Sequence, residues 1–229
     1  MLVLVRHGES AWNATDRFTG WVDVALTRDG REEARVAGRG LCEQEIVPTA
    51  VHTSMLVRAR DTARLMLEAC GAATLTEVRS ARLNERHYGA LQGIPRTEAV
   101  ERYGADAVSR WRRGIRDRPP ADAHGRAESL ADVRARLGPY VEGELLPALD
   151  AGHTVLVVSH GNTMRMLTQL LVGLSDAEAS ALEVPTGVPT IYRDVSQLVP
   201  GRPSRVAARV IRGAPVSRRQ TPRPGGAAW

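Results

Sequence analysis

The sequence predicts a three-layer α/β/α fold with a mostly parallel central sheet. Two short apolar runs, LVLV at 2–5 and TVLVV at 154–158, are typical of strands that are buried on both faces. Stretches with helical periodicity alternate with extended segments along most of the chain. Because a helix that connects two parallel strands covers a face of the sheet, this alternation indicates a layered α/β domain.

Local signals place the individual elements. In chain order we expect a strand at 2–5, a helix at 28–44, an extended piece at 50–53, helices at 55–69, 96–103 and 128–150, a strand at 154–158, a helix at 162–172, and strands near 190–194 and 206–211. Ser54 is the expected N-cap of the helix at 55–69, and Gly71 is expected to end it. Gly104 is expected to end the helix at 96–103.

The 229 residues are expected to form one domain and a tail. The domain covers 1–212 and carries a polar, arginine-rich insertion at about 79–127, and 213–229 form a basic, disordered tail. The net charge is +5, but 195–229 hold seven arginines and no acidic residue, which leaves 24 arginines against 26 acidic residues elsewhere. Because this basic segment lacks interleaved aromatic residues, we expect a solvated tail and no nucleic-acid partner.

Hydropathy and cysteine usage argue against a membrane protein, a secreted protein and a zinc or redox protein. No apolar run reaches the length of a membrane span, and the apolar start of the chain is too short for the core of a signal peptide. We therefore expect a cytoplasmic protein with no membrane partner. Cys42 and Cys70 lack the spacing of a zinc or redox motif, and both are interpreted as buried thiols.

Two His-Gly pairs follow apolar strands. LVLVRHG and VLVVSHG place His7 and His160 at corresponding strand ends, where parallel sheets usually keep their ligand sites. A lone histidine is more often structural than catalytic. Two at matching positions favour a functional site, and the imidazoles will meet if the strands are neighbours.

Phosphoryl transfer is chemistry that these residues can perform. A histidine attacks phosphorus when a hydrogen bond holds one ring nitrogen and leaves the other its lone pair. The anionic group needs fixed positive charge, and an arginine fork grips two phosphate oxygens. Arg6, Arg58 and His160 are candidates for such a cradle, with the backbone N–H groups of Gly161 and Asn162 if a helix begins there. Arg58 considered alone is equally well interpreted as a helix surface residue.

The motifs LVRHGES, WN, RFTGW, LNERHYGALQG, WRRG, SHGN and PTGVP occur in this order over about 1–194. Together they resemble the 2,3-bisphosphoglycerate-dependent phosphoglycerate mutases of the histidine phosphatase superfamily. The resemblance implies a phosphoglycerate mutase-like fold with His7 as the phosphorylated nucleophile, His160 in contact with the transferred group, and Glu85 as the acid and base. From the residues alone, an ion pair between Glu85 and Arg86 is the preferred interpretation of Glu85. The substrate contacts that the resemblance implies are Arg6, Ser10, Asn13, Thr19, Gly20, Arg58, Glu85, Arg86, Tyr88, Arg96, Arg112, Arg113, Gly161 and Asn162.

The resemblance also implies a reaction. Phosphorylated His7 gives its phosphoryl group to 3-phosphoglycerate, which forms 2,3-bisphosphoglycerate. This intermediate, which is also the primer, returns its other phosphoryl group to the enzyme and leaves 2-phosphoglycerate. The reaction is a step of glycolysis and gluconeogenesis. No metal is expected, the phosphoglycerates are the small-molecule partners, and the sequence is compatible with a homo-oligomer.

Two departures from the family keep alternatives open. Arg96 stands where the family usually has lysine, in a chain that contains no lysine, and the connection at 115–127 is markedly shorter than in most relatives. A shorter connection at the mouth of the site would admit water, so the alternative is a histidine phosphatase that hydrolyses a small phosphorylated metabolite through the same phosphohistidine. A catalytically silent binding protein is a third interpretation, disfavoured because His7, Glu85, Arg6, Arg58 and His160 are all present.

Overall fold

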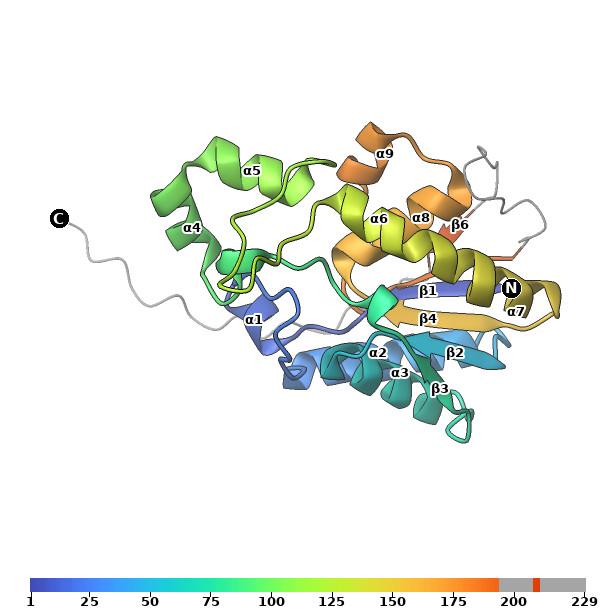
Figure 1. Ribbon diagram of the computed structural model, residues 1–229. Coiled ribbons are helices and arrows are strands. Elements are labelled where there is room, and N and C mark those ends of the chain that lie inside the picture. The colour runs from blue at the N-terminus through green and yellow to red at the C-terminus, as the bar shows by residue number, and fades with distance from the viewer. Residues whose placement is uncertain (194–207, 211–229) are drawn as a thin grey trace.

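The computed structural model describes residues 1–193 and 208–210, which are built around a six-stranded sheet with the strand order β3-β2-β4-β1-β5-β6 (Figure 1). The first four of these strands are mutually parallel, and β5 is antiparallel to both β1 and β6. The strands are β1 (Leu2–Arg6), β2 (Ala50–Thr53), β3 (Glu77–Arg79), β4 (Val155–Ser159), β5 (Pro189–Tyr192) and β6 (Ala208–Val210). The predicted mostly parallel α/β fold is confirmed.

Helices cover both faces of the sheet and form the outer two layers. The helices are α1 (Ala11–Ala14), α2 (Arg28–Cys42), α3 (Val57–Ala69), α4 (Arg96–Tyr103), α5 (Ala105–Arg113), α6 (Leu130–Tyr140), α7 (Leu146–Asp150), α8 (Gly161–Val172) and α9 (Asp176–Ala181). Side chains alternate along β1, so Leu2 and Leu4 enter a core shared with α6 to α9, whereas Val3 and Val5 enter a core shared with α2 and α3. This burial on both faces explains the continuous apolar run.

The predicted insertion lies beyond the carboxyl ends of β1 and β4, where Figure 1 shows α4 and α5. Its residues Leu91, Ala99 and Val108 form a small core together with Phe18 from the first part of the chain. Short 3-10 helices at Ala81–Leu83 and Gly89–Leu91 connect it to β3. The insertion therefore forms a wall over the end of the sheet at which the two His-Gly pairs lie.

Two of the predicted helices differ in detail. The predicted cap Ser54 makes no cap bond to α3, whose N-cap is Leu56; instead, the Asp23 carboxylate accepts from the Val57 N–H at 2.7 Å. The helix predicted at 128–150 is interrupted by a π-helical turn, Val141–Leu145, after Pro139. Because proline has no N–H, it cannot complete the regular hydrogen-bond ladder of an α-helix.

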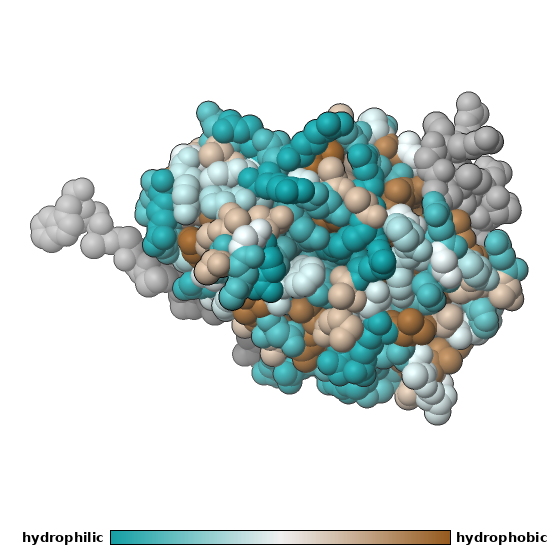
Figure 2. All heavy atoms as spheres, viewed as in Figure 1, coloured by the Kyte–Doolittle hydropathy of each residue, from teal (hydrophilic) through white to brown (hydrophobic). Residues whose placement is uncertain are grey.

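The remaining predictions concern the two cysteines, membrane-spanning segments and the C-terminal tail. Cys70 is buried as expected, but Cys42 is exposed, which corrects that prediction. Figure 2 shows a mostly hydrophilic face on which hydrophobic residues are scattered. Within residues 1–193 and 208–210 no helix has the length and apolar character needed to cross the membrane. The domain boundary at 212 and the tail at 213–229 lie outside the described residues.

Candidate active site

The carboxyl ends of β1 and β4 bring the two His-Gly pairs together. The strands are parallel neighbours with Arg6 opposite Ser159, and the His7 N–H donates to the Ser159 carbonyl at 2.9 Å. The ring centroids of His7 and His160 lie 5.0 Å apart. The prediction that these imidazoles meet is confirmed.

The ring of His7 is held in one tautomer. Its Nδ1 lies 2.6 Å from the Gly8 carbonyl oxygen, which can only accept, so Nδ1 carries the proton and Nε2 has the lone pair. Arg58 Nε donates to Nε2 at 3.3 Å. Burial, and then the charges of Arg58 and Arg6, hold the pKa of His7 well below its usual range. The side chain is thus a neutral imidazole with its nucleophilic nitrogen beside two guanidinium groups.

The ring of His160 packs edge-on against that of His7. Ser54 Oγ hydrogen bonds to His160 Nε2 at 2.8 Å, whereas Nδ1 is buried without a hydrogen-bond partner among the described residues. Arg6 Nε is likewise buried without a hydrogen-bond partner among the described residues. Burial is the main reason that the pKa of His160 lies well below the usual value. Arg6 Nε is an N–H donor on a side chain that lines the cavity described below, so an oxygen of a phosphoryl group could satisfy it.

Arg58 is anchored from the RFTGW motif. Its two terminal nitrogens donate to the carbonyl oxygens of Gly20 at 2.8 Å and Val22 at 2.9 Å, and burial lowers its pKa to about 10. Gly20 has a φ of +56°, and a Cβ there would lie 2.1 Å from Gln92 Oε1. Only glycine fits this turn, so the motif fixes the position of the guanidinium beside His7.

Glu85 reaches the site from the insertion. Its Oε1 accepts from the backbone N–H of Arg86 at 2.8 Å and from that of Asn162 at 3.3 Å. Helix α8 begins at Gly161, one residue before the predicted start. The guanidinium of Arg86 lies over the Tyr88 ring instead, 4.5 Å from its centroid. The structure thus joins Glu85 to the backbone of Arg86, which differs from the ion pair preferred on the residues alone.

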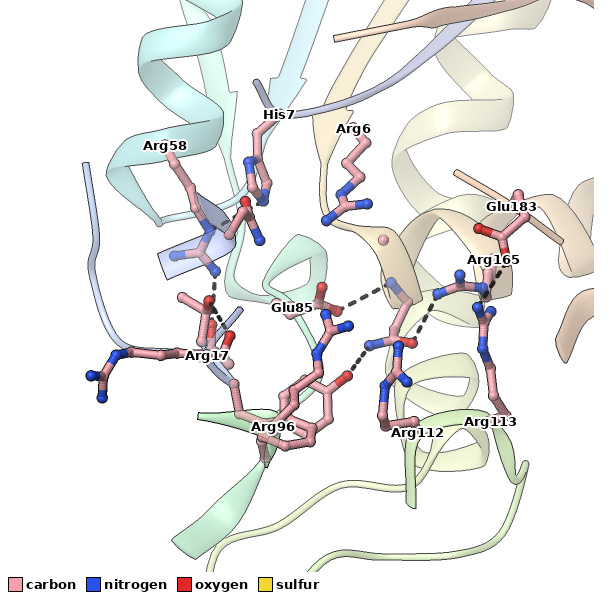
Figure 3. A pocket seen from close by; sticks show the side chains of 17 residues that line it. Arg6, His7, Arg17, Arg58, Glu85, Arg96, Arg112, Arg113, Arg165 and Glu183 are labelled. Atoms are coloured by element: carbon pink, nitrogen blue, oxygen red, sulfur yellow. Dashed lines mark hydrogen bonds and ion pairs between the residues drawn. The ribbon is translucent and has the colours of Figure 1, made fainter. Parts of the chain in front are cut away.

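These side chains surround a cavity of about 220 Å³ (Figure 3). Of the predicted site residues, those that line it are Arg6, His7, Asn13, Thr19, Gly20, Arg58, Glu85, Tyr88, Arg96, Arg112, Arg113, Gly161 and Asn162. Three predicted residues do not line it. His160 is fully buried next to His7, Arg86 is buried against Tyr88, and Ser10 caps α1 by accepting from the Asn13 N–H.

Four lining residues were not predicted, namely Arg17, Phe18, Arg165 and Glu183. Arg17 and Phe18 belong to the RFTGW motif, and Arg165 follows Asn162 by three residues on α8, so helical spacing could have identified it. Glu183 lies in an irregular segment after α9, where no periodicity exists to signal it.

A buried neutral histidine in an arginine-lined cavity, at the carboxyl end of an α/β sheet, is suited to phosphoryl transfer through histidine. The sequence matches the histidine phosphatase superfamily (branch 1) over residues 2–193, and the chain belongs to this superfamily.

Individual relatives fall into two activity classes. The chain is 43% identical over 222 residues to a 2,3-bisphosphoglycerate-dependent phosphoglycerate mutase of Clavibacter michiganensis, with 87% of this chain and 88% of the relative covered. A mycobacterial glucosyl-3-phosphoglycerate phosphatase in complex with VO3 is similar in structure, with a TM-score of 0.72, 27% identity, and 93% and 99% of the two chains covered. A phosphoglycerate mutase from Bacillus anthracis has a TM-score of 0.65, 25% identity, and coverage of 82% and 85%.

Proposed function

We propose that the protein is a 2,3-bisphosphoglycerate-dependent phosphoglycerate mutase that interconverts 3-phosphoglycerate and 2-phosphoglycerate. The observation that carries the proposal is the presence of two separate cationic groups in one cavity, with Glu85 between them (Figure 3). The groups are Arg6 and Arg58 beside His7, and Arg96, Arg112 and Arg113 from α4 and α5 across the cavity. A small ligand with an anion at each end matches this arrangement, and the 43% identity to a named mutase supports it.

The first transfer starts from phosphorylated His7, with the phosphoryl group on Nε2. The C2 hydroxyl oxygen of 3-phosphoglycerate attacks phosphorus and its proton passes to Glu85. The P–N bond breaks, and its electron pair returns to Nε2. The arginines across the cavity hold the substrate carboxylate, which orients the reacting hydroxyl. The product of this step is 2,3-bisphosphoglycerate.

The second transfer is the reverse step at the other carbon. After 2,3-bisphosphoglycerate reorients, His7 Nε2 attacks its C3 phosphorus, and the departing C3 oxygen takes the proton from Glu85. This leaves 2-phosphoglycerate and phosphorylated His7, and the same attack on free 2,3-bisphosphoglycerate primes the resting enzyme. Guanidinium groups and the backbone N–H groups at the start of α8 supply the positive charge, so the proposed reaction uses no metal.

A phosphatase is the second candidate, favoured by the path of the short connection at 115–127. None of its residues lines the cavity. It packs instead on the 3-10 helix at Gly89–Leu91, where the Ala90 N–H donates to the Pro120 carbonyl at 2.9 Å. A mouth that this connection does not cover lets water compete for the phosphohistidine, and the structural likeness to a phosphatase agrees with that outcome.

One assay on the full chain separates the candidates. We expect 3-phosphoglycerate, coupled to enolase, to give product that depends on a trace of 2,3-bisphosphoglycerate, and we expect His7→Ala to abolish both phosphoenzyme formation and turnover. The matched control is His124→Ala, an exposed histidine outside the cavity, which should behave as the wild type. Product formation without the primer, or release of inorganic phosphate alone, would contradict the mutase proposal. Turnover in a pure His7→Ala sample would show that His7 is not the nucleophile. If the wild type turned over no phosphoester, the catalytically silent binding protein would be favoured.

A further inference from the structure

The segment at 180–184, which comprises the end of α9 and the residues that follow it, holds three of the cavity arginines. Each is bound by a backbone carbonyl of alternate residues along the segment. The contacts are Arg113 Nη1 to Ser180 O at 3.0 Å, Arg165 Nε to Leu182 O at 2.8 Å, and Arg6 Nη1 to Val184 O at 2.8 Å. The segment is therefore a wall of the cavity that fixes the positions of its cations.

Glu183 adds a carboxylate to this wall. It lines the cavity, and its Oε1 accepts from Arg113 Nη2 at 2.8 Å, at the side of the cavity away from His7 (Figure 3). Because Ser180 holds Nη1, both terminal nitrogens of Arg113 have partners. The Glu183 side chain is 80% exposed and that of Arg113 34%, so a ligand can reach this ion pair from solvent.

This contact changes what the far end of the cavity can bind. Among the described residues, seven arginines and two carboxylates line the cavity, and the other carboxylate, Glu85, is held by backbone N–H groups. Glu183 occupies Nη2 of Arg113, one of the three arginines that hold the substrate carboxylate in the proposed function, and it neutralises that charge. A carboxylate is also a good acceptor for hydroxyl groups.

We propose that Glu183 is a specificity-determining residue that lowers the demand for a second anion, so that the site also accepts phosphate esters whose non-reacting end carries hydroxyl groups. This inference rests on the proposed phosphoryl-transfer function. A ligand with a distal carboxylate must displace Glu183 from Arg113, whereas a ligand with a distal hydroxyl donates to Glu183 and leaves the pair intact.

A matched pair of ligands tests the proposal. 3-Phosphoglycerate and glycerol 3-phosphate differ only in a carboxylate against a hydroxymethyl group, and calorimetry on the full chain gives Kd for each. In Glu183→Gln we expect 3-phosphoglycerate to bind about two- to fivefold more tightly, which is the range for an exposed ion pair, and glycerol 3-phosphate to bind no more tightly than before. Glu142→Gln removes the same charge from an exposed position outside the cavity and should leave both constants unchanged.

A double-mutant cycle shows whether Glu183 acts through Arg113. In an Arg113→Ala background, Glu183→Gln should no longer change the ratio of the two constants. The inference would be overturned if Glu183→Gln left the ratio of the two constants unchanged, or if it changed the ratio equally in the wild-type and Arg113→Ala backgrounds. In either case, tight binding of 3-phosphoglycerate would leave the proposed function intact. Wild-type protein that binds neither ligand would overturn both.

Discussion

At the scale of single residues, the site depends on groups that fix the two imidazoles. The Gly8 carbonyl determines which nitrogen of His7 has the lone pair. Ser54 Oγ hydrogen bonds to Nε2 of His160, whose Nδ1 has no hydrogen-bond partner in the part of the chain that the structure describes. The Ser54 hydroxyl also accepts from the Leu56 N–H at 3.2 Å, so it is itself held in place. Ser54 is therefore a positioning residue for His160.

Ser54→Ala tests this role. Without the hydroxyl the His160 ring loses its orientation, and we expect kcat to fall on the order of tenfold while KM for 3-phosphoglycerate stays the same. The matched control is Ser129→Ala, which removes the buried N-cap hydroxyl of α6 far along the chain. That variant should lose about 1 kcal/mol of the free energy of unfolding and keep its kcat. Equal losses of kcat in the two variants would show that Ser54 contributes only stability.

At the scale of elements, the end of β1 is locked against the start of α2. A Cβ on Gly8 would lie 2.1 Å from the Gly30 carbonyl oxygen, and one on Gly30 would lie 2.0 Å from the Glu9 carbonyl oxygen. The Gly8 N–H also donates to Thr62 Oγ1 of α3 at 3.0 Å. The glycine of the first His-Gly pair thus allows close packing of backbone against backbone, which positions His7.

Gly8→Ala should therefore destabilise the protein. The methyl group has no space, so backbone must move, and we expect the free energy of unfolding to fall by about 2 kcal/mol or more, as in overpacked cores. In Gly161→Ala, at the second His-Gly pair, the added Cβ would lie no closer than 3.6 Å to Arg6 Nε, so stability should be kept. Urea denaturation of both variants measures the difference. A loss no larger in Gly8→Ala than in Gly161→Ala would contradict the packing argument.

Elements whose signals lie within their own residues were predictable, and features that depend on residues distant in sequence were not. Burial on both faces makes β1 and β4 recognisable as apolar runs, whereas the sequence left open whether the two strands are neighbours, and the structure shows that they are. The cap of α3 was wrong because Asp23, which binds the Val57 N–H, lies 34 residues away in sequence, and the hydroxyl of Ser54 is drawn to His160. Helices α1, α5 and α9 were not predicted, and α1 and α9, with four and six residues, are too short to show helical periodicity.

Site residues that belong to the sequence motifs were predictable. The cradle around His7 follows from strand ends and from the resemblance, and the lining by Arg58, Glu85 and Arg112 agrees with it. Ser10 was placed among the substrate contacts because it lies in the first motif, but in the structure it serves the capping box of α1. Glu183 was missed because a tertiary contact with Arg113, 70 residues away in sequence, brings it to the cavity.

At the scale of the whole molecule, four of the six histidines are buried, namely His7, His52, His87 and His160. Burial is the first cause that lowers the pKa of each one. His52 and His87 lie outside the reacting centre, where Nδ1 of His52 hydrogen bonds to Tyr140 Oη at 2.8 Å and Nδ1 of His87 accepts from the Gly89 N–H at 3.0 Å. The folded chain therefore holds several neutral imidazoles that the unfolded chain would protonate in mild acid.

This difference makes stability depend on pH between 7.5 and 5.0. A histidine with a lowered folded pKa binds its proton more readily in the unfolded chain, so stability is full above the unfolded pKa of about 6.5 and falls as the pH drops below it. For His7 or His160 the loss at pH 5.0 reaches up to about 2 kcal/mol each. Asp122 and Asp132, with pKa values of about 2, act only below pH 4 and do not contribute in this window. Urea denaturation at the two pH values should show a smaller loss in His7→Asn than in the wild type, with the exposed His124→Asn as control. A loss in His7→Asn as large as that of the wild type would mean that the neutral state of this imidazole is not imposed by folding.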